Sequence, residues 1–332
     1  MKGRIKVLIL GIGGLGDLVR LFPLVASLRE ELPQVELFLL TSHPQAEEIF
    51  SLLSPTERPH RIIFWDLLRR PPLFEKVHLF GRLLLHRFAL LFDTSRGTGW
   101  RGNARLVRLL RAEKKIGFWA PGLSPSHLHL ALPFNTQRPI VFQNLALLNL
   151  AGFKGRLFFP FRKDLPFPEG IPRKGLVVLH AGAAERGRLW PEAHWLQLAA
   201  HLQGRFQVVA VGGQEEARLF ANRPEVINLC GRLRLEELAG LLKEACLFVG
   251  VDSGPLHLAL ALKTPSVGIF GPTDPRQVVG EEGGLFRAVF SGRPCAPCYQ
   301  HLPGQKVRCP EAPCLQEISP EEVLLKVESL LS

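Results

Sequence analysis

Residues 249–275, VGVDSGPLHLALALKTPSVGIFGPTDP, combine acidic, hydroxyl and imidazole side chains with glycine and proline turns. Asp252, Ser253 and Gly254 follow an apolar, strand-like segment, and His257 falls in the first turn of the helix expected after them. Amide N–H groups at a helix start are unpaired and carry the positive end of the helix dipole, so such a turn can bind phosphate. A second apolar run, 266–270, ends at another glycine-proline turn. Two such turns at one edge of a parallel sheet predict a nucleotide-diphosphate site.

A second segment of the same kind spans residues 180–191, HAGAAERGRLWP. An apolar run ends at its first residue, a loop of small residues and a basic side chain follow, and a proline stands where a helix would begin. Backbone amides and a bidentate arginine both suit phosphate oxygens. The candidate phosphate contacts in this segment are His180, Gly182, Ala183, Ala184 and Arg188.

A third glycine turn, Gly11–Gly16, satisfies G-x-G-x-x-G directly after a strand-like run and before a helical one. Taken alone, it would predict a dinucleotide-dependent oxidoreductase. That function also needs an acidic residue at the end of the second strand, on the ribose. Here the second strand is expected to end at Thr41 and His43, while Glu36 lies near its beginning. This alternative therefore lacks half of its pattern.

The segments at 249–275 and 180–191 resemble those of the bacterial heptosyltransferases, glycosyltransferase family 9, which move heptose from ADP-heptose onto the inner core of lipopolysaccharide. The run D-S-G-P-L-H-L-A-x-A-L-x-T-P followed by F-G-P-T-D-P is similar to a long family motif, and 180–191 resembles H-x-G-x-x-x-x-x-K-x-W-P. The chain departs from this second pattern. Arg188 replaces the more usual lysine, and Ala183 and Ala184 replace the hydroxyl residues of some members, which puts the identity of the donor in doubt.

The resemblance also implies roles in the amino-terminal half. Gly16-Asp17 with Pro23 is similar to the family's G-D-x-x-x-x-x-P opening, in which the aspartate is the proposed general base. Asp93 and Arg96, in DTSRG, resemble a turn that contacts the acceptor, and Gly14 and Gly16 are assigned to the same half. An acidic residue after Gly212-Gly213 would hold the nucleoside ribose, for which Glu215 is preferred to Glu216.

These residues together predict an inverting glycosyl transfer that needs no metal ion. Asp17 would accept the proton of an acceptor hydroxyl as it attacks the anomeric carbon of a nucleotide-activated sugar. Amides at Ala183–Ala184 and Ser253–Gly254, with Arg188, would stabilise the leaving diphosphate. His257 and Asp252 would position the diphosphate and the nucleoside.

Apolar runs alternate with amphipathic segments along the whole chain, which predicts an α/β fold with parallel sheets. The predicted strands include Ile5–Leu10, Leu90–Asp93 and Leu247–Val251, and the predicted helices include Asp17–Glu31 and Phe74–Phe88. We expect Rossmann-like domains at 1–160 and 175–316, a proline-rich linker at 161–174 and a terminal helix within 317–332. Two such domains facing across a cleft would form the GT-B architecture, which the resemblance also implies. The resemblance alone suggests that the terminal helix packs back on the first domain.

The positive charge of the chain lies in one half. Residues 1–170 carry 24 Lys and Arg against 13 Asp and Glu, whereas 171–332 carry 17 of each. The excess peaks over Arg58–Lys115 and predicts an anionic partner: a glycolipid or glycan acceptor, an anionic membrane surface or nucleic acid. A nucleic-acid-binding protein is thus an alternative, although the aromatic-basic interleaving of RNA modules is missing. No apolar run reaches the length of a membrane span. We expect a cytoplasmic monomer, peripheral to the inner face of the cell membrane.

Four of the six cysteines form the pattern C-x2-C-x10-C-x4-C: Cys295, Cys298, Cys309 and Cys314. Such a set can hold structural zinc or an iron–sulfur cluster, can form disulfides, or can remain as thiols. All three alternatives stay open at this point, and none of them takes part in the predicted transfer.

Overall fold

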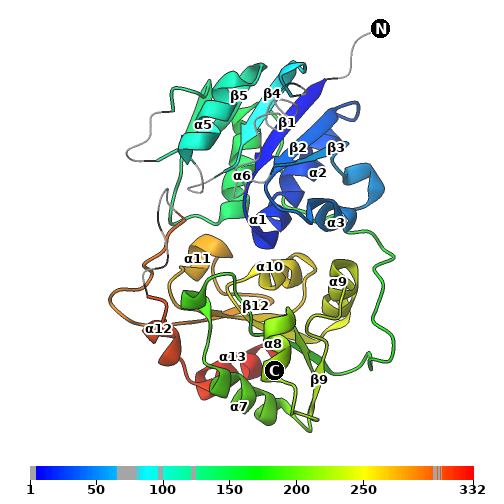
Figure 1. Ribbon diagram of the computed structural model, residues 1–332, viewed down its shortest axis with the longest axis vertical. Helices are drawn as coiled ribbons and strands as arrows, with labels where there is room; N and C mark the ends of the chain where they lie inside the picture. Colours follow the sequence, from blue (N-terminus) through cyan, green and yellow to red (C-terminus); the bar gives the residue numbers. More distant parts are fainter. Residues whose placement is uncertain are drawn as a thin grey trace. The chain divides into compact units, whose positions relative to one another are not determined.

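The computed structural model describes residues 5–65, 81, 83–95, 100–120, 125–301, 305, 307 and 309–332, excluding the side chains of 100–103 (Figure 1). The chain forms two compact units. The first comprises Met1–Arg162 with His301–Gln305, and the second comprises Lys163–Gln300 with Lys306–Ser332. The boundary after Arg162 lies at the start of the predicted linker.

The first unit is built on a six-stranded parallel sheet in the order β3-β2-β1-β4-β5-β6. In register, Leu10 of β1 pairs with Leu40 of β2 and with Asp93 of β4. Its strands are β1 (Lys6–Gly11), β2 (Glu36–Thr41), β3 (Arg61–Phe64), β4 (Phe88–Asp93), β5 (Ala112–Trp119) and β6 (Leu130–Pro133). Its helices are α1 (Leu15–Val19), α2 (Phe22–Glu31), α3 (Ala46–Ser51), η1 (Pro55–Glu57), α5 (Trp100–Leu109) and α6 (Ile140–Leu150).

Side chains alternate between the two faces of this sheet, as expected for strands. Leu8 and Leu10 of β1 pack in one core cluster with Leu106 and Val107 of α5. The predicted helix Asp17–Glu31 is two helices in the structure, separated at Arg20–Leu21. Pro23, in the first turn of α2, has no N–H to continue the hydrogen bonds of α1, so the chain starts a new helix there. Most of the predicted helix Phe74–Phe88 lies outside the described residues, and β4 begins at Phe88.

The second unit repeats this topology in the order β12-β11-β10-β7-β8-β9. When the strands of each unit are numbered one to six along the chain, both sheets have the Rossmann order 3-2-1-4-5-6. Its strands are β7 (Leu176–His180), β8 (Gln207–Val211), β9 (Val226–Asn228), β10 (Leu247–Val251), β11 (Ser266–Phe270) and β12 (Phe286–Phe290). Its helices are η2 (Arg186–Arg188), α7 (Glu192–Leu202), α8 (Gln214–Leu219), α9 (Leu235–Glu244), α10 (Gly254–Ala261), α11 (Pro275–Val278), α12 (Pro313–Gln316) and α13 (Pro320–Leu331).

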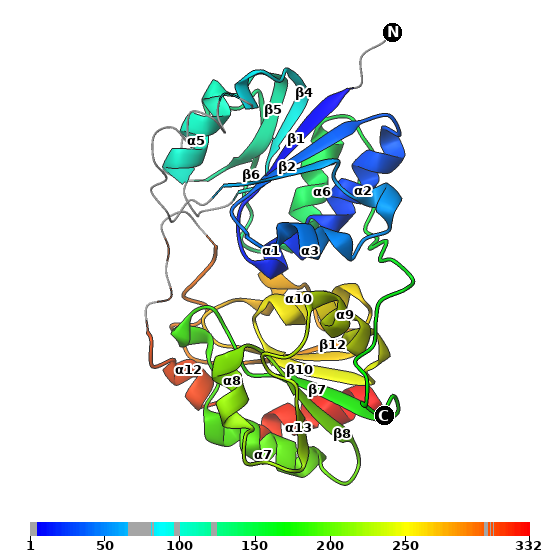
Figure 2. The ribbon, with the colours of Figure 1, turned by 45° about the vertical axis from the view of Figure 1, so that its right-hand side comes forward.

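The terminal helix α13 belongs to the second unit, which differs from the prediction that it packs on the first domain. It contacts α7, β11 and β12 (Figure 2). Its apolar side chains Val323 and Val327 are fully buried in the core cluster that contains Trp195 of α7. The helix covers this face of its own sheet because its apolar stripe is buried there.

The predicted linker also packs on the second unit. The carbonyl oxygen of Pro166 would lie 2.0 Å from a Cβ atom placed on Gly240 of α9, so only glycine allows this approach. Nearby, the Arg173 guanidinium stacks 4.1 Å from the ring centroid of Phe167. The segment after Arg162 is therefore held against α9 over part of its length.

Candidate functional site

The predicted donor residues gather at the carboxyl edge of the second sheet, because all strands of a parallel sheet end on the same side. His180 is the last residue of β7, and Asp252 directly follows β10. Arg188 lies in the loop after β7, and His257 lies in the first turn of α10. This edge of a Rossmann-type sheet is where ligands bind.

Asp252 lies between two of the predicted donor-binding side chains. Its carboxylate is buried, with Oδ2 3.4 Å from Arg188 Nη1 and Oδ1 3.5 Å from His257 Nε2. Arg188 Nη2 also lies 3.7 Å from Glu185 Oε1. The structure thus brings together three residues that are up to 69 positions apart in the sequence. A buried carboxylate needs such partners, and here they hold a guanidinium at the loop predicted to bind phosphate.

His180 contacts Ser253, which occupies the N-cap position of α10 but makes no side-chain capping hydrogen bond. The Ser253 hydroxyl is 3.1 Å from His180 Nδ1 and 3.1 Å from the carbonyl oxygen of Val251. Burial lowers the pKa of His180 to about 4, so the imidazole is neutral at physiological pH. His180 can therefore hold the Ser253 turn through hydrogen bonding, but it does not add positive charge to the site.

The loop after β8 shows why the two neighbouring glutamates differ. Glu216 accepts a hydrogen bond from the Gly213 amide at 2.6 Å, and its Oε1 would lie 2.6 Å from a Cβ atom on Gly182. Gly182 is therefore needed for the close packing of this carboxylate. Glu215 is exposed in the first turn of α8. Because Glu216 is engaged in capping, Glu215 remains the better candidate for a ligand.

Two further candidate phosphate contacts, Ala183 and Ala184, lie in the loop between β7 and η2. Ala183 packs against the core of the second unit, and Ala184 is exposed. Gly254 is the first residue of α10.

In the first unit, the turn after β1 fixes the side chain of Asp17. Asp17 Oδ2 accepts a hydrogen bond from the Gly14 amide at 3.0 Å, and Oδ1 lies 2.8 Å from Arg20 Nη2. Gly13 has a φ of +144°, and a Cβ atom there would lie 2.2 Å from Asp17 Oδ2. Gly16 is buried in the same helix turn. The carboxylate is 29% exposed, so it is held in place while remaining accessible.

Asp93, at the end of β4, lies in a buried polar group that the sequence only partly predicts. Its Oδ1 accepts hydrogen bonds from the amide and the hydroxyl of Ser95, and its Oδ2 lies 4.0 Å from His127 Nε2. Burial raises the pKa of Asp93 to about 6, although the Ser95 bonds oppose this shift. His127 was not predicted, because no motif joins it to Asp93. Burial, with Arg108 and Lys115, lowers the pKa of His127.

Arg96, the second predicted acceptor contact, lies outside the described residues. Of the basic stretch, Arg105, Arg108 and Arg111 are exposed on and just after α5. They flank Leu109, whose side chain is 59% exposed. Among the described side chains of this helix, the exposed arginines therefore form a basic surface beside the apolar Leu109.

The four carboxyl-terminal cysteines are free thiols in the structure. Burial raises the pKa of Cys314, and the nearby Cys298 and Cys295 raise it further. Within the described part of the chain, however, no three His, Cys, Asp or Glu side chains form a group that could hold a metal ion. Cys295 and Cys298 are thus near Cys314, but the described side chains are not arranged as a complete ligand set.

One residue that the sequence analysis missed lies directly beside Arg188. The guanidinium carbon of Arg188 is 5.0 Å from the ring centroid of Tyr299. Tyr299 is the single tyrosine of the chain and follows Cys298, but nothing in the pattern indicated a contact with a residue 111 positions earlier.

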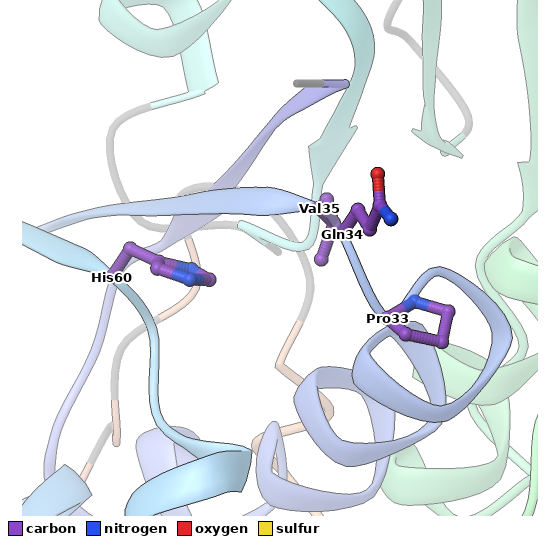
Figure 3. Close-up of a pocket in the computed structure, with 4 residues that line it drawn as sticks. All are labelled: Pro33, Gln34, Val35 and His60. Carbon is purple, nitrogen blue, oxygen red and sulfur yellow. The ribbon is translucent and has the colours of Figure 1, made fainter.

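In the first unit, a hollow of about 390 Å³ lies at the amino-terminal side of the sheet, away from Asp17 and Asp93. Pro33, Gln34 and Val35, which follow α2, and His60, which precedes β3, line it (Figure 3). His60 Nδ1 accepts a hydrogen bond from the Leu37 amide at 3.1 Å, and a ring nitrogen lies 2.9 Å from Arg29 Nη1. His60 thus has a structural role at the edge opposite to the predicted chemistry.

Comparison with known proteins supports the family suggested by the motifs. The model of glycosyltransferase family 9 (heptosyltransferase) matches residues 154–302, which include all predicted donor residues. Lipopolysaccharide heptosyltransferase 1 of Pseudomonas aeruginosa is 31% identical over 206 residues, 53% of this chain and 58% of that protein. Lipopolysaccharide heptosyltransferase 3 of Escherichia coli is 26% identical over 294 residues, 78% and 81% of the two chains. The family model and these relatives support assignment of the chain to the heptosyltransferase family of glycosyltransferases.

Solved structures show the same fold. The E. coli heptosyltransferase WaaC with ADP superposes with a TM-score of 0.74 at 19% identity, covering 98% of this chain and 100% of WaaC. The dodecameric iron-containing heptosyltransferase TibC gives a TM-score of 0.62 at 18% identity, covering 100% of this chain and 77% of TibC. The predicted α/β fold of GT-B class, with two Rossmann-like parallel sheets, is confirmed. Neither the oxidoreductase nor the nucleic-acid alternative is carried further, because the family is one of transferases.

Proposed function

We propose that this heptosyltransferase-family protein transfers a heptose from ADP-heptose to a hydroxyl of a lipopolysaccharide-core or related cell-envelope glycan, with inversion at the anomeric carbon. The observation that carries the proposal is the cluster of Arg188, Asp252 and His257 beside the start of α10. The names of the relatives support the sugar and the glycan, and WaaC, whose solved structure contains ADP, supports the nucleotide.

The donor diphosphate would bind at the carboxyl edge of the second sheet. Amides of Ala183–Ala184 and Ser253–Gly254 would donate hydrogen bonds to its oxygens, because such amides lie at a loop and at a helix start. Arg188 would supply the positive charge in place of the lysine that is more usual at this position of the motif. Its planar guanidinium can donate two hydrogen bonds to phosphate oxygens. Glu215 would contact the ribose, since Glu216 is used to cap α8.

In the transfer step, the acceptor oxygen forms a bond to the anomeric carbon while the bond from that carbon to the diphosphate oxygen breaks. The electron pair of the broken bond leaves with ADP, where Arg188 and the amides stabilise the developing charge. The proton of the acceptor hydroxyl passes to Asp17, which is held by Gly14 and Arg20. No metal ion takes part in the proposed step, so chelators should leave the rate unchanged.

The acceptor would be anionic and the contact with the membrane peripheral. Arg105, Arg108 and Arg111 on the exposed side of α5 supply a basic surface, and Leu109 adds an apolar contact. Basic residues near an anionic leaflet each contribute about 1 kcal/mol of attraction. Among the described residues, no helix has the length and apolar character needed to cross a bilayer. We propose a monomer that works at the inner face of the cell membrane. Light scattering and co-sedimentation with anionic and neutral vesicles would test both points.

A structural metal at the four cysteines has partial support. The neighbouring fold TibC is an iron-containing heptosyltransferase, and Cys295 and Cys298 lie near the Cys314 thiol in this chain. The described cysteines do not form a complete ligand set, so no step of the reaction depends on a metal there. Metal analysis of protein purified under reducing conditions would decide this, with about one equivalent of zinc, or about two to four of iron for an iron–sulfur cluster, expected if the site is occupied.

The function is tested by incubating the purified protein with ADP-heptose and a heptose-deficient lipopolysaccharide core. We expect release of ADP together with a glycan that is heavier by one heptose, and a glycosidic bond of inverted configuration by NMR. UDP- and GDP-linked sugars serve as matched donors. Faster turnover with either of them would contradict the assignment of the nucleotide. Absence of transfer from all three donors would contradict the function itself.

A further inference from the structure

The guanidinium of Arg188 is in contact on several sides with groups of the second unit. Carboxylate oxygens of Asp252 and Glu185 lie 3.4 Å and 3.7 Å from its terminal nitrogens. Nη1 donates a hydrogen bond to Asp252, and both distances are longer than those of tight bidentate pairs. The ring of Tyr299, whose centroid is 5.0 Å from the guanidinium carbon, provides an additional contact.

The contact with Tyr299 has the properties of a strong cation–π interaction. Such interactions occur within about 6 Å of the ring centroid and strengthen when water is excluded. Here the side chain of Arg188 is 16% exposed and Tyr299 is 8% exposed. The ring is therefore mostly shielded from water together with its cation.

The backbone of Tyr299 is attached to the sheet edge that carries the donor residues. Its amide donates a hydrogen bond to the Pro272 carbonyl at 2.8 Å, and it forms a parallel bridge with Thr273. The next residue is also held, because the buried Gln277 side chain donates to the Gln300 carbonyl at 2.8 Å. The ring position is therefore fixed relative to the turn after β11.

Val307 and Cys309 also support the loop of Arg188. A Cβ atom placed on Gly187 would lie 2.6 Å from the carbonyl oxygen of Cys309 and 2.3 Å from Val307 Cγ1. Gly187 therefore allows these two residues to pack directly on η2. Tyr299 contacts Arg188, and Val307 and Cys309 contact Gly187.

We propose that Tyr299 is a positioning residue for the donor diphosphate, acting through Arg188, and that Val307 and Cys309 support the loop that carries Arg188. This inference rests on the proposed function, because it takes Arg188 as a diphosphate contact. Tyr299 orders the guanidinium before the donor arrives, which reduces the conformational entropy lost on binding.

Calorimetric titration of the full chain with ADP and with adenosine tests the proposal, since only ADP carries the phosphates that Arg188 would bind. We expect Tyr299→Leu to weaken ADP binding about 5- to 20-fold, in line with the loss of a shielded cation–π contact. Adenosine affinity should stay within about twofold of the wild-type value, and Tyr299→Phe, which keeps the ring, should stay within about threefold for ADP.

A double-mutant cycle separates positioning from general packing. In an Arg188→Ala background, Tyr299→Leu should change ADP affinity by less than about twofold, because the group on which it acts is gone. An equal loss of ADP and adenosine affinity would instead overturn the proposal, as would a full effect in the Arg188→Ala background.

If Tyr299→Leu does not fold, phenylalanine analogues of increasing fluorine content at position 299 provide the second measurement. Fluorination removes the negative face of the ring with little change in its shape, so ADP affinity should fall stepwise with each added fluorine. A constant affinity across the series would refute the role of Tyr299 alone. Failure of the wild-type protein to bind ADP at all would overturn the donor assignment, and this role with it.

Discussion

The two units have the same strand order but build different chemistry at the same edge of the sheet. In the second unit, the residues after the first and fourth strands include Arg188, Ser253 and His257, with Asp252 between Arg188 and His257. In the first unit, the corresponding turns present carboxylates, Asp17 and Asp93. The Rossmann topology therefore fixes where a ligand binds, while the turn residues decide what is bound there.

The contrast is clearest for the two aspartates at the ends of the fourth strands. Both are buried, but Asp252 faces Arg188, whereas Asp93 faces Ser95 and a histidine whose pKa is lowered. Burial raises the pKa of Asp93 to about 6. Burial of Asp93 disfavours its charged form, and carboxyl groups with raised pKa values are common at functional sites.

The largest expected effect belongs to the first unit. Asp17→Asn should lower kcat by about 10²- to 10⁴-fold, because the acceptor hydroxyl loses its proton acceptor. ADP affinity, a property of the second unit, should change by no more than a few-fold. Steady-state kinetics and calorimetry measure the two quantities separately. The exposed Glu31→Gln variant in α2 is a matched control of equal charge change. Normal turnover of the Asp17→Asn enzyme would show that the base lies elsewhere.

The opposite pattern is expected for Arg188→Ala in the second unit. It should raise the KM for the donor about 10- to 100-fold, since a charge-assisted hydrogen bond contributes roughly 1.5–3 kcal/mol. The KM for the acceptor should stay near the wild-type value. Arg188→Lys should show a smaller increase, because it keeps the charge but not the fork. Equal increases for donor and acceptor would contradict the division of roles between the units.

A smaller effect is expected from a substitution in the glycine turn that packs against the Asp17 side chain. Gly13→Ala places a methyl group 2.2 Å from Asp17 Oδ2, so the carboxylate must move and kcat should fall about tenfold or more. Gly152→Ala is the matched control, because Gly152 also has a positive φ, +92°, but no atom lies within 4 Å of its Cβ position. Similar losses of kcat in both variants would point to backbone strain rather than to displacement of Asp17.

The remaining effects concern stability and pH rather than turnover, and they have opposite signs in the two units. The pKa of Asp93 is raised from 3.8 to about 6. Its favourable contribution to the free energy of unfolding is therefore full below pH 3.8 and is lost as the pH rises to about 6. The stability of the Asp93→Asn variant relative to the wild type should therefore increase as the pH rises from 3.8 to about 6. The relative gain above pH 6 is on the order of 3 kcal/mol.

The contribution of His180 to stability depends on pH in the opposite direction. Its pKa is lowered from 6.5 to about 4, so its contribution is full above pH 6.5 and is lost as the pH falls towards 4. His180→Gln should remove part of this acid sensitivity. Urea unfolding of both variants between pH 4 and pH 8 measures the two trends. Parallel pH dependences of the two variants would contradict the assigned environments.

The strands buried on both faces, and the turns that follow them, could be predicted from the sequence. Continuous apolar runs mark β1, β7 and β10, and the glycine, proline and aspartate residues after them mark the turns. β5 was missed because its first half, AEKK, is largely polar and exposed. The short edge strand β6 has only partly buried or exposed side chains, so its pattern was weak as well.

Contacts between distant segments could not be predicted in the same way. Motif matching gave Asp17 and Asp252 because each lies in a local pattern, but His127 and Tyr299 become relevant only through residues far away in the chain. The same limit applies to α13, whose amphipathic stripe indicates a buried face but not the sheet that it covers.

The packing of Pro166 on Gly240 has a consequence for the proline-rich stretch after Arg162. Because Pro166 lies directly on α9, this stretch is not a free spacer over its whole length. Any side chain at position 240 should therefore release the stretch from α9.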